Sequence, residues 1–234
     1  MIGPSAVLLL VFVGLLVIGT PIAVSLGLAG VAAIAVGLDA ASLQMVGINT
    51  YASIGKYPLI AIPLFILTGM LFERSGVALR LVTLAQAIIG PRRGGLALVA
   101  ILVCLIMGGM SGSGPADAAA VATIMIPSMR RAGYPEAFSA SVIAASASTA
   151  ILIPHSIALI VSSIMVPGTD LRALFAAGLI PGLLAGAAVA IPTVWLSHRH
   201  DLGAAEESIR PPFWASLRDA VPGLLAPVII LGGL

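Results

Sequence analysis

Residues 108–117, Gly-Gly-Met-Ser-Gly-Ser-Gly-Pro-Ala-Asp, form a glycine- and serine-rich run inside apolar sequence and end in a carboxylate. Arginine pairs flank the surrounding segment at 92–93 and 130–131. One membrane crossing takes about 20 residues. The segment between the pairs, 94–129, is longer than that, but it is too short for two crossings and a turn. If both pairs lie on the cytoplasmic side, as the positive-inside tendency favours, the segment enters the membrane, turns and returns. The run therefore predicts a re-entrant hairpin with its turn at membrane depth.

The composition indicates a polytopic helical membrane protein. Hydrophobic residues make up 60% of the 234 residues and charged residues only 9%, a balance that soluble domains of this length do not show. The net charge of +2 gives no sign of nucleic-acid binding, because the basic residues are better explained as topology markers. The single cysteine, Cys104, excludes disulfides within the chain, and packing is its expected role. We expect an all-α, multi-pass membrane protein.

Charges and prolines divide the chain into six parts. They are an N-terminal scaffold with an interfacial connector (1–57), a transmembrane helix with a cytoplasmic connector (58–91), the re-entrant hairpin (92–131), a broken helix with a following transmembrane helix (132–196), a cytoplasmic connector (197–220) and the start of a further transmembrane helix (221–234). The interruption at 19–21 permits either one long tilted helix or two segments in 2–38. This topology puts nine arginines inside and only Lys56 and Arg172 outside.

A second irregular stretch interrupts the apolar segment 136–166, where proline and hydroxyl side chains at 148–149 and 154–156 are expected to unwind the helix and free carbonyl groups. At the hairpin, a first half-helix, 96–107, would point unpaired carbonyls and its negative dipole end at the turn. A second half-helix, 115–126, would point free amides there. One turn can therefore face both a cation and a carboxylate, with oxygens of the broken helix opposite.

These two stretches make up the predicted binding site. We expect contacts to substrate or cation from Ser111, Gly112, Ser113, Gly114, Asp117, Ser148, Thr149, Pro154, His155 and Ser156, with Ser111, Ser113 and Thr149 as Na⁺ ligands. Sodium needs several oxygens and little charge, so hydroxyl and carbonyl groups suffice, and glycine lets backbone approach a ligand closely. We expect no catalytic residue and no cofactor other than the coupling ion.

Each of these residues also has a purely structural interpretation. Small residues in membrane helices most often permit close packing, and hydroxyls in turns often satisfy their own backbone. Asp117 follows Pro115, where a carboxylate caps a helix or compensates its dipole, although intramembrane acids are functional by default. His155 is either a proton-responsive group or a hydrogen-bonded filler. Proton coupling through Asp117 or His155 therefore stays an alternative to sodium.

Six stretches along the chain also carry a family resemblance. They are Gly19-Thr-Pro-Ile-Ala, Pro58-Leu-Ile-Ala-Ile-Pro-Leu-Phe-Ile-Leu, Ser111-Gly-Ser-Gly-Pro-Ala-Asp-Ala-Ala-Ala, Ile124-Met-Ile-Pro-Ser-Met, Ile151-Leu-Ile-Pro-His-Ser and Phe175-Ala-Ala-Gly-Leu-Ile-Pro-Gly. In this order they resemble the N-terminal half of the large membrane subunit of tripartite ATP-independent periplasmic (TRAP) transporters. The resemblance implies a sodium-coupled, elevator-type secondary transporter of the bacterial inner membrane. It also implies an organic acid substrate such as a C4-dicarboxylate, handed over by a periplasmic binding protein, and a small membrane subunit as partner.

The chain departs from that family at identifiable places. Pro154-His155-Ser156 stands where Pro-Pro-Ser is usual, and Ser146 and Ser148 stand where glycines are frequent. The resemblance implies two inverted repeats, each with a hairpin and a broken helix, and only one is present. The last apolar run is also too short to span a membrane. We therefore expect an incomplete fragment that does not transport alone.

Three other functions fit parts of the sequence. One is a sodium- or proton-coupled carboxylate carrier that needs no binding protein. Another is a rhomboid-like intramembrane serine protease, because Gly109-Met-Ser-Gly112 matches the short G-x-S-G pattern and His155 would serve as the base. A third is a membrane scaffold that docks other subunits without transporting. The transporter interpretation explains the hairpin and the broken helix together, and the protease pattern is only a tetrapeptide.

Overall fold

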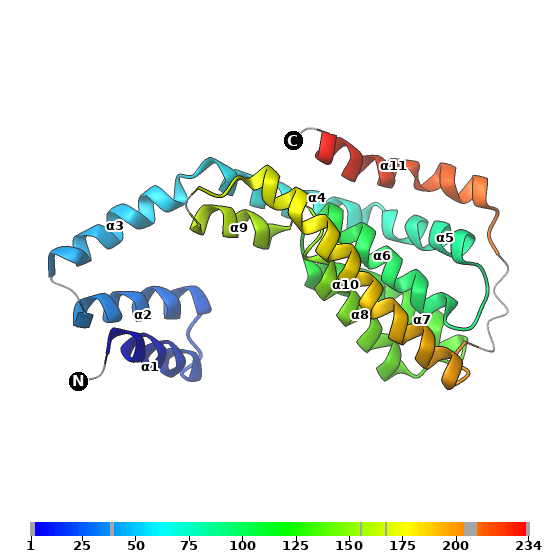
Figure 1. Cartoon of the computed structure of the whole chain (residues 1–234), viewed down its shortest axis with the longest axis horizontal. Coiled ribbons are helices and arrows are strands. Elements are labelled where there is room, and N and C mark those ends of the chain that lie inside the picture. Colours follow the sequence, from blue (N-terminus) through cyan, green and yellow to red (C-terminus); the bar gives the residue numbers. More distant parts are fainter. Residues whose placement is uncertain (1–2, 38–39, 155, 167, 204–209, 233–234) are drawn as a thin grey trace. The chain divides into compact units, whose positions relative to one another are not determined.

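The computed structural model describes residues 3–37, 40–154, 156–166, 168–203 and 210–232, and within these ranges every regular element is a helix (Figure 1). The predicted all-α class is therefore confirmed for the described residues. By its internal contacts the chain divides into two compact units, Met1–Lys56 and Tyr57–Leu234, which are described separately below.

The first unit contains three helices: α1 (Pro4–Val17), α2 (Ile22–Gly37) and α3 (Ala40–Ile54). The chain reverses at Gly19, which adopts a φ of 86°, and Thr20 Oγ1 donates a hydrogen bond of 2.7 Å to the carbonyl of Leu15. Gly37 at the end of α2 lies against the ring of Pro4, so α1 and α2 are antiparallel. Residues 2–38 thus contain two helices instead of one, and α3 follows where a loop or a short helix was expected.

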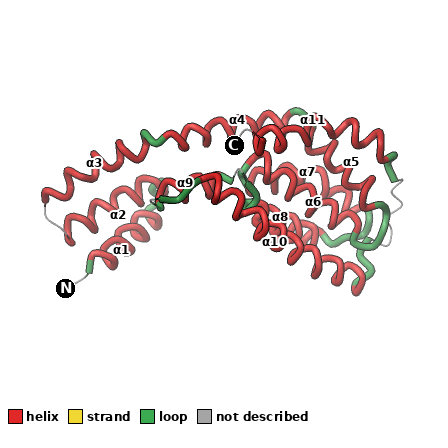
Figure 2. The backbone as a smooth tube through the Cα atoms, turned by 45° about the horizontal axis from the view of Figure 1, so that its top comes forward, coloured by secondary structure: helices red, strands yellow, loops and turns green. Residues whose placement is uncertain are grey.

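The second unit is built around one buried helix. Its elements are η1 (Tyr57–Ile60), α4 (Ala61–Arg74), α5 (Val77–Ile89), α6 (Gly95–Ser111), α7 (Gly114–Arg131), α8 (Glu136–Ala150), α9 (Ile157–Met165), α10 (Leu171–Arg199) and α11 (Phe213–Gly232). Helix α6 packs against α4, α5, α7, α8 and α10, and the tube view shows α6 and α7 side by side (Figure 2). Because α6 is surrounded, residues such as Val103 and Cys104 are fully buried.

Several loops meet at one end of this unit. Asp201, just after α10, forms an ion pair with Arg93 at 3.0 Å, and the carbonyl of Leu202 accepts a hydrogen bond from Gly94 N. Gly203 lies against the ring of Tyr134, in the turn between α7 and α8. We call this region the arginine end, defined by Arg92, Arg93, Arg130, Arg131, Arg199 and Arg210. The two arginine pairs that flank the hairpin thus lie at the same end of the unit, as the hairpin prediction requires.

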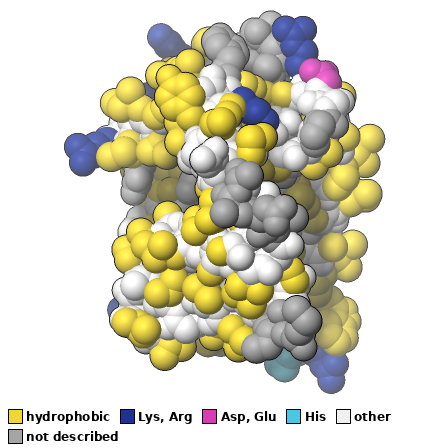
Figure 3. Space-filling view, turned by 90° about the vertical axis from the view of Figure 1, so that its left-hand side faces the viewer, with side chains coloured by type: hydrophobic (Ala, Val, Ile, Leu, Met, Phe, Trp, Pro, Cys, Tyr) yellow, Lys and Arg dark blue, Asp and Glu magenta, His cyan; other side chains and the backbone are white. Residues whose placement is uncertain are grey.

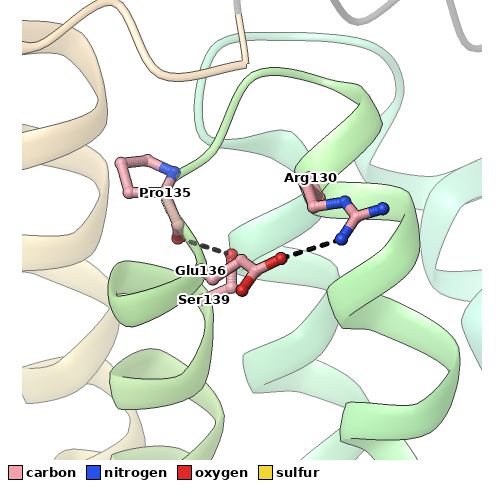
Figure 4. Close-up of polar contacts among 4 residues, drawn as sticks. All are labelled: Arg130, Pro135, Glu136 and Ser139. Atoms are coloured by element: carbon pink, nitrogen blue, oxygen red, sulfur yellow. Dashed lines mark hydrogen bonds and ion pairs between the residues drawn. The ribbon is translucent and has the colours of Figure 1, made fainter.

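The turn between α7 and α8 is closed by polar contacts at its surface. Arg130 pairs with Glu136 at 3.0 Å, and Ser139 Oγ donates to the carbonyl of Pro135 at 3.1 Å (Figure 4). Both charged side chains are mostly exposed. An exposed ion pair contributes little stability, so we expect this pair to add little to the stability of the turn.

The surface of the chain carries many apolar side chains (Figure 3). Among the described residues, α10 is the one single helix long and apolar enough to cross a membrane, and residues 42–54 and 58–72 pass the same test only when taken together. Four shorter apolar helices, α1, α2, α5 and α6, accompany them. Exposed residues such as Leu10 of α1 and Ile180 of α10, at 64% and 67%, suit a lipid or protein environment.

The hairpin helices are longer than the half-helices predicted at 96–107 and 115–126. They have 17 and 18 residues, or about 26 Å each at about 1.5 Å per residue. Residues 108–111 stay helical, and the missing side chain of Gly108 leaves room for α8, since a Cβ there would lie 2.8 Å from Ala150 O. The re-entrant position of the hairpin in a membrane stays a prediction.

Candidate functional site: the hairpin tip and the helix break

The turn between α6 and α7 consists of two residues. Gly112 has a φ of 63°, in the left-handed region that glycine adopts without strain, and its N–H donates to the carbonyl of Gly108 at 3.1 Å. Ser113 is extended and is the N-cap residue immediately before α7. A single left-handed glycine therefore reverses the chain, and the ten-residue run expected as a turn is mostly helical. We call residues 111–114 the hairpin tip.

A buried hydrogen-bond network fixes the tip. Ser111 Oγ donates to Asp117 Oδ1 at 2.7 Å and accepts from the backbone N–H of Ser113 at 3.0 Å. Ser111 is 7% exposed and Asp117 1%. The carboxylate lies in the first turn of α7, where the helix dipole favours negative charge. Ser111 thus has the turn-forming role that the sequence left open, and Asp117 is hydrogen-bonded to the turn.

Ser113 differs from Ser111 although the two serines are two residues apart. It is partly exposed, and its side chain makes no capping hydrogen bond to α7. The Ser113 hydroxyl is therefore the tip oxygen that remains able to contact a ligand.

The predicted break in the following helix is present, although it begins later than expected. Helix α8 ends at Ala150, the next turns are closed by hydrogen bonds from Leu152 N to Thr149 O and from Ile153 N to Ala150 O, and α9 begins at Ile157. Ser156 caps α9 by accepting a 3.2 Å hydrogen bond from Ala158 N. Pro154 and Ser156 are buried, while His155 lies outside the described residues.

The other two predicted break residues lie inside α8. Ser148 Oγ donates to Ala144 O and Thr149 Oγ1 donates to Ser146 O, both at 2.8 Å. Hydroxyls bonded to their own helix in this way are satisfied locally. Ser148 is exposed, and neither hydroxyl has a hydrogen bond to the hairpin tip within the described part of the chain.

The tip and the break lie against each other. The N–H of Ile157, at the start of α9, donates to the carbonyl of Gly112 at 3.5 Å. A side chain at Gly114 would lie 2.8 Å from Ala147 O, and one at Gly108 would lie 2.8 Å from Ala150 O. The ends of α6 and α8 therefore converge at one place, together with the starts of α7 and α9.

Further glycines close this place from two other helices, and the sequence analysis did not assign them to the site. On α4, a Cβ at Gly69 would lie 3.2 Å from Ser111 Cβ. On α10, a Cβ at Gly178 would lie 2.6 Å from Leu152 O, and one at Gly182 would lie 3.1 Å from Ile153. The four-residue spacing of Gly178 and Gly182 is the signal that could have identified them, since small residues at this spacing mark close helix contacts. The packing interpretation therefore holds for these glycines.

Most of the polar atoms at this place are uncharged. Among the described residues, no three His, Cys, Asp or Glu side chains gather in a way that could hold a metal ion. The carboxyl ends of α6 and α8 carry partial negative charge, and the amino ends of α7 and α9 carry partial positive charge. A cation here would be held by carbonyl and hydroxyl oxygens with Asp117 nearby, and an anion by backbone amides.

Comparison with known proteins gives a consistent result. The family model described as "Tripartite ATP-independent periplasmic transporter, DctM component" matches residues 9–234. The chain is 35% identical over 227 residues to a putative TRAP transporter large permease protein of Haemophilus influenzae, covering 97% of this chain and 53% of that protein. It is 40% identical over 210 residues to the C4-dicarboxylate TRAP transporter large permease protein DctM of Pseudomonas aeruginosa, covering 90% and 49%. It is 34% identical over 227 residues to the sialic acid TRAP transporter large permease protein SiaM of Vibrio cholerae, covering 95% and 52%. The chain thus spans about half the length of the curated relatives it matches.

Proposed function

The chain belongs to the DctM family of tripartite ATP-independent periplasmic transporters, and from this premise we propose that it is part of a sodium-coupled permease that imports an organic acid across the bacterial inner membrane. Its partners would be a small membrane subunit and a periplasmic binding protein that delivers the substrate. Because the chain covers about half of its relatives, transport would need the remaining half as well.

The observation that carries this proposal is the meeting of the hairpin tip with the helix break, through the hydrogen bond from Ile157 N to Gly112 O. Broken helices whose ends converge are the common way in which secondary transporters hold ions and substrates. In the proposed site, carbonyls at the carboxyl ends of α6 and α8 and the hydroxyl of Ser113 contact sodium. The amides at the starts of α7 and α9 face the substrate's carboxylate.

Roles for the other predicted residues follow from their positions. Asp117 adds a negative charge beside the tip, which would favour a cation over an anion at the α6 side. We propose that Gly112 and Gly114 let the backbone approach the ligands, and that Pro154 and Ser156 hold the break open. Ser148, Thr149 and His155 would contribute only if the break rearranges when ligand binds.

The substrate class rests on charge. The relatives are named for C4-dicarboxylates, sialic acid, 2,3-diketo-L-gulonate and isethionate; the first three are carboxylic acids and isethionate is a sulfonate, so all are organic anions. Two helix amino ends at one place suit one anionic group of any of them, because backbone amides respond to the charge and not to the rest of the molecule. We infer that the anionic group of the organic acid, most often a carboxylate, is recognised here and that discrimination among acids is made elsewhere in the transporter.

The test is uptake by the complete transporter in proteoliposomes, with the binding protein supplied on the outside. We expect uptake to follow an inward sodium gradient, to stop when choline replaces sodium, and to fall at least tenfold in Ser113→Leu, while the subunits still assemble. If uptake instead follows a proton gradient in choline buffer, the transporter is coupled to protons and not to sodium, and Asp117 is the candidate proton-binding group. Normal uptake by Ser113→Leu would remove the tip from the site.

The protease interpretation finds no support. The Ser111 hydroxyl is buried and donates to a carboxylate, and the relatives are permeases and not enzymes. The elevator movement and the re-entrant placement of the hairpin remain parts of the proposal, which the same reconstituted system can examine by accessibility of cysteines placed at the tip.

A further inference from the structure

An apolar groove runs along the outer face of α10 close to its carboxyl end. It is lined by Ala190, Ile191, Val194, Trp195 and His198, which share one face of the helix, and its volume is about 580 Å³. Ile191 and Trp195 are 70% and 57% exposed. The opposite face of α10 is the one that packs inward, through residues such as Gly186 and Thr193. The groove therefore faces away from the core of the unit.

A cation lies at the end of this groove. The guanidinium of Arg199 is stacked over the ring of Trp195, with 5.1 Å between its central carbon and the ring centroid. A stacked guanidinium keeps its edge N–H groups free for oxygen acceptors. The ring of His198 is held in place by a 2.9 Å hydrogen bond between Nδ1 and the carbonyl of Val194. Along this face of α10, the apolar groove is thus followed by the positive charge of Arg199.

The neighbouring loop adds positive charge to the same place. Gly94 lies against Ser197 and Val194, so Arg92 and Arg93 stand beside the last turns of α10. The acids nearby are engaged: Asp201 pairs with Arg93 and Glu136 pairs with Arg130. Arg199 takes part in neither of these two ion pairs, and the sequence of α10 contains no acid. Among the described residues, the balance of charge at this end of the groove is positive.

We propose that this groove binds an acidic phospholipid, with an acyl chain along Ile191, Val194 and Trp195 and the phosphate at Arg199. A lipid fits because it needs an apolar channel that ends in a cation beside an interfacial tryptophan, and this order is found along α10. The inference requires the chain to lie in a membrane but does not require transport or sodium, so failure of the sodium test would leave it standing.

The chain offers a local reporter for this test. Its only tryptophans are Trp195 and Trp214, so Trp214→Phe leaves Trp195 as the single fluorophore. This variant is placed in nanodiscs that always contain the same mixture of phosphatidylglycerol and phosphatidylcholine. In one sample the phosphatidylglycerol carries brominated acyl chains, which quench tryptophan on contact, and in the other the phosphatidylcholine does. The composition is identical, so a difference in quenching reports which lipid occupies the groove.

We expect phosphatidylglycerol to occupy the site about fivefold more often than phosphatidylcholine. This factor corresponds to about 1 kcal/mol, the attraction between one basic side chain and an anionic membrane surface. The preference should disappear in Arg199→Gln and persist in Arg199→Lys. Arg172→Gln, which removes an exposed arginine at the other end of the same helix, is the matched control and should keep it. Equal quenching by both lipids, or a preference unchanged in Arg199→Gln, would overturn the proposal. Quenching by neither lipid would also overturn it, because protein and not lipid would then cover the groove.

Discussion

The two serines of the hairpin tip provide the sharpest prediction, because the same substitution should have a different consequence at each. Ser111→Ala removes a buried 2.7 Å hydrogen bond to the Asp117 carboxylate and also takes the acceptor from Ser113 N–H. A hydrogen bond to a charged group contributes about 1.5 to 3 kcal/mol, and an unsatisfied donor costs about 1 to 3 kcal/mol, so we expect a loss of about 2.5 to 6 kcal/mol. Ser113→Ala removes a partly exposed hydroxyl without a capping bond and should cost less than about 0.5 kcal/mol.

The measurement is equilibrium unfolding of the two variants in mixed micelles, followed by circular dichroism, in choline and then with increasing sodium. Ser111→Ala should lower stability already in choline. Ser113→Ala should match the parent in choline but lose the stabilisation by sodium, which for a bound ligand at a hundred times its Kd is about 2.7 kcal/mol. If Ser113→Ala proved the more destabilising variant in choline, or if the two variants responded to sodium alike, the division of roles between the serines would be wrong.

Two further predictions concern packing and tethering. Gly108→Ala should destabilise by about 1 to 3 kcal/mol in the same unfolding assay, because its new methyl group would collide with α8. Gly30→Ala is the control, since a new methyl group there would meet no neighbouring element within 4 Å, and it should be neutral or slightly stabilising. Equal effects of the two substitutions would argue against close packing at the tip. Arg210→Gln should cost about 1 to 3 kcal/mol, since Nε donates to a carbonyl at the end of α5 at 2.9 Å. Arg218→Gln, an exposed arginine on α11, is the matched control, and an equal loss there would assign the effect to charge and not to the tether.

The turn between α6 and α7 lies inside the run from which the sequence predicted it, because its signals are local, while re-entry into a membrane stays a prediction. A glycine that must turn the chain, a proline near the start of the second helix and flanking arginines are all visible in residues 92–131. The extent of the turn was wrong for a tertiary reason. Glycines at 108 and 109 disfavour a helix in isolation, but burial against α8 keeps them helical. Likewise the expected connector at 197–220 overlaps α10, which continues to Arg199, and α11, which begins at Phe213 and packs on α5.

The predicted site stays a prediction, but the structure shows which of its residues lie together and which neighbours were missed. Ser111, Gly112, Ser113, Gly114 and Asp117 come together as expected, but which serine is structural could not be predicted, since the distinction depends on a side chain that reaches Asp117 across the turn. The glycines on α4 and α10 that close the site lie far away in sequence, and only their contacts with Ser111 and with residues 152–153 reveal them.

In the proposed site, the glycines would explain how one place suits both a cation and an anion with Asp117 as the acid beside it. A helix end carries about half an elementary charge, and its effect falls off within about one turn, so two ends act together only if they nearly touch. Larger side chains at Gly108 and Gly114 would push α8 away from the hairpin, because their Cβ atoms would meet backbone oxygens at 2.8 Å. Close packing is therefore an electrostatic requirement here, since it brings two carboxyl ends and two amino ends into the same small volume. It follows that Gly108→Ala should weaken sodium binding even at temperatures where the protein stays folded, and sodium binding at parental strength in folded Gly108→Ala would show that the helix ends act independently.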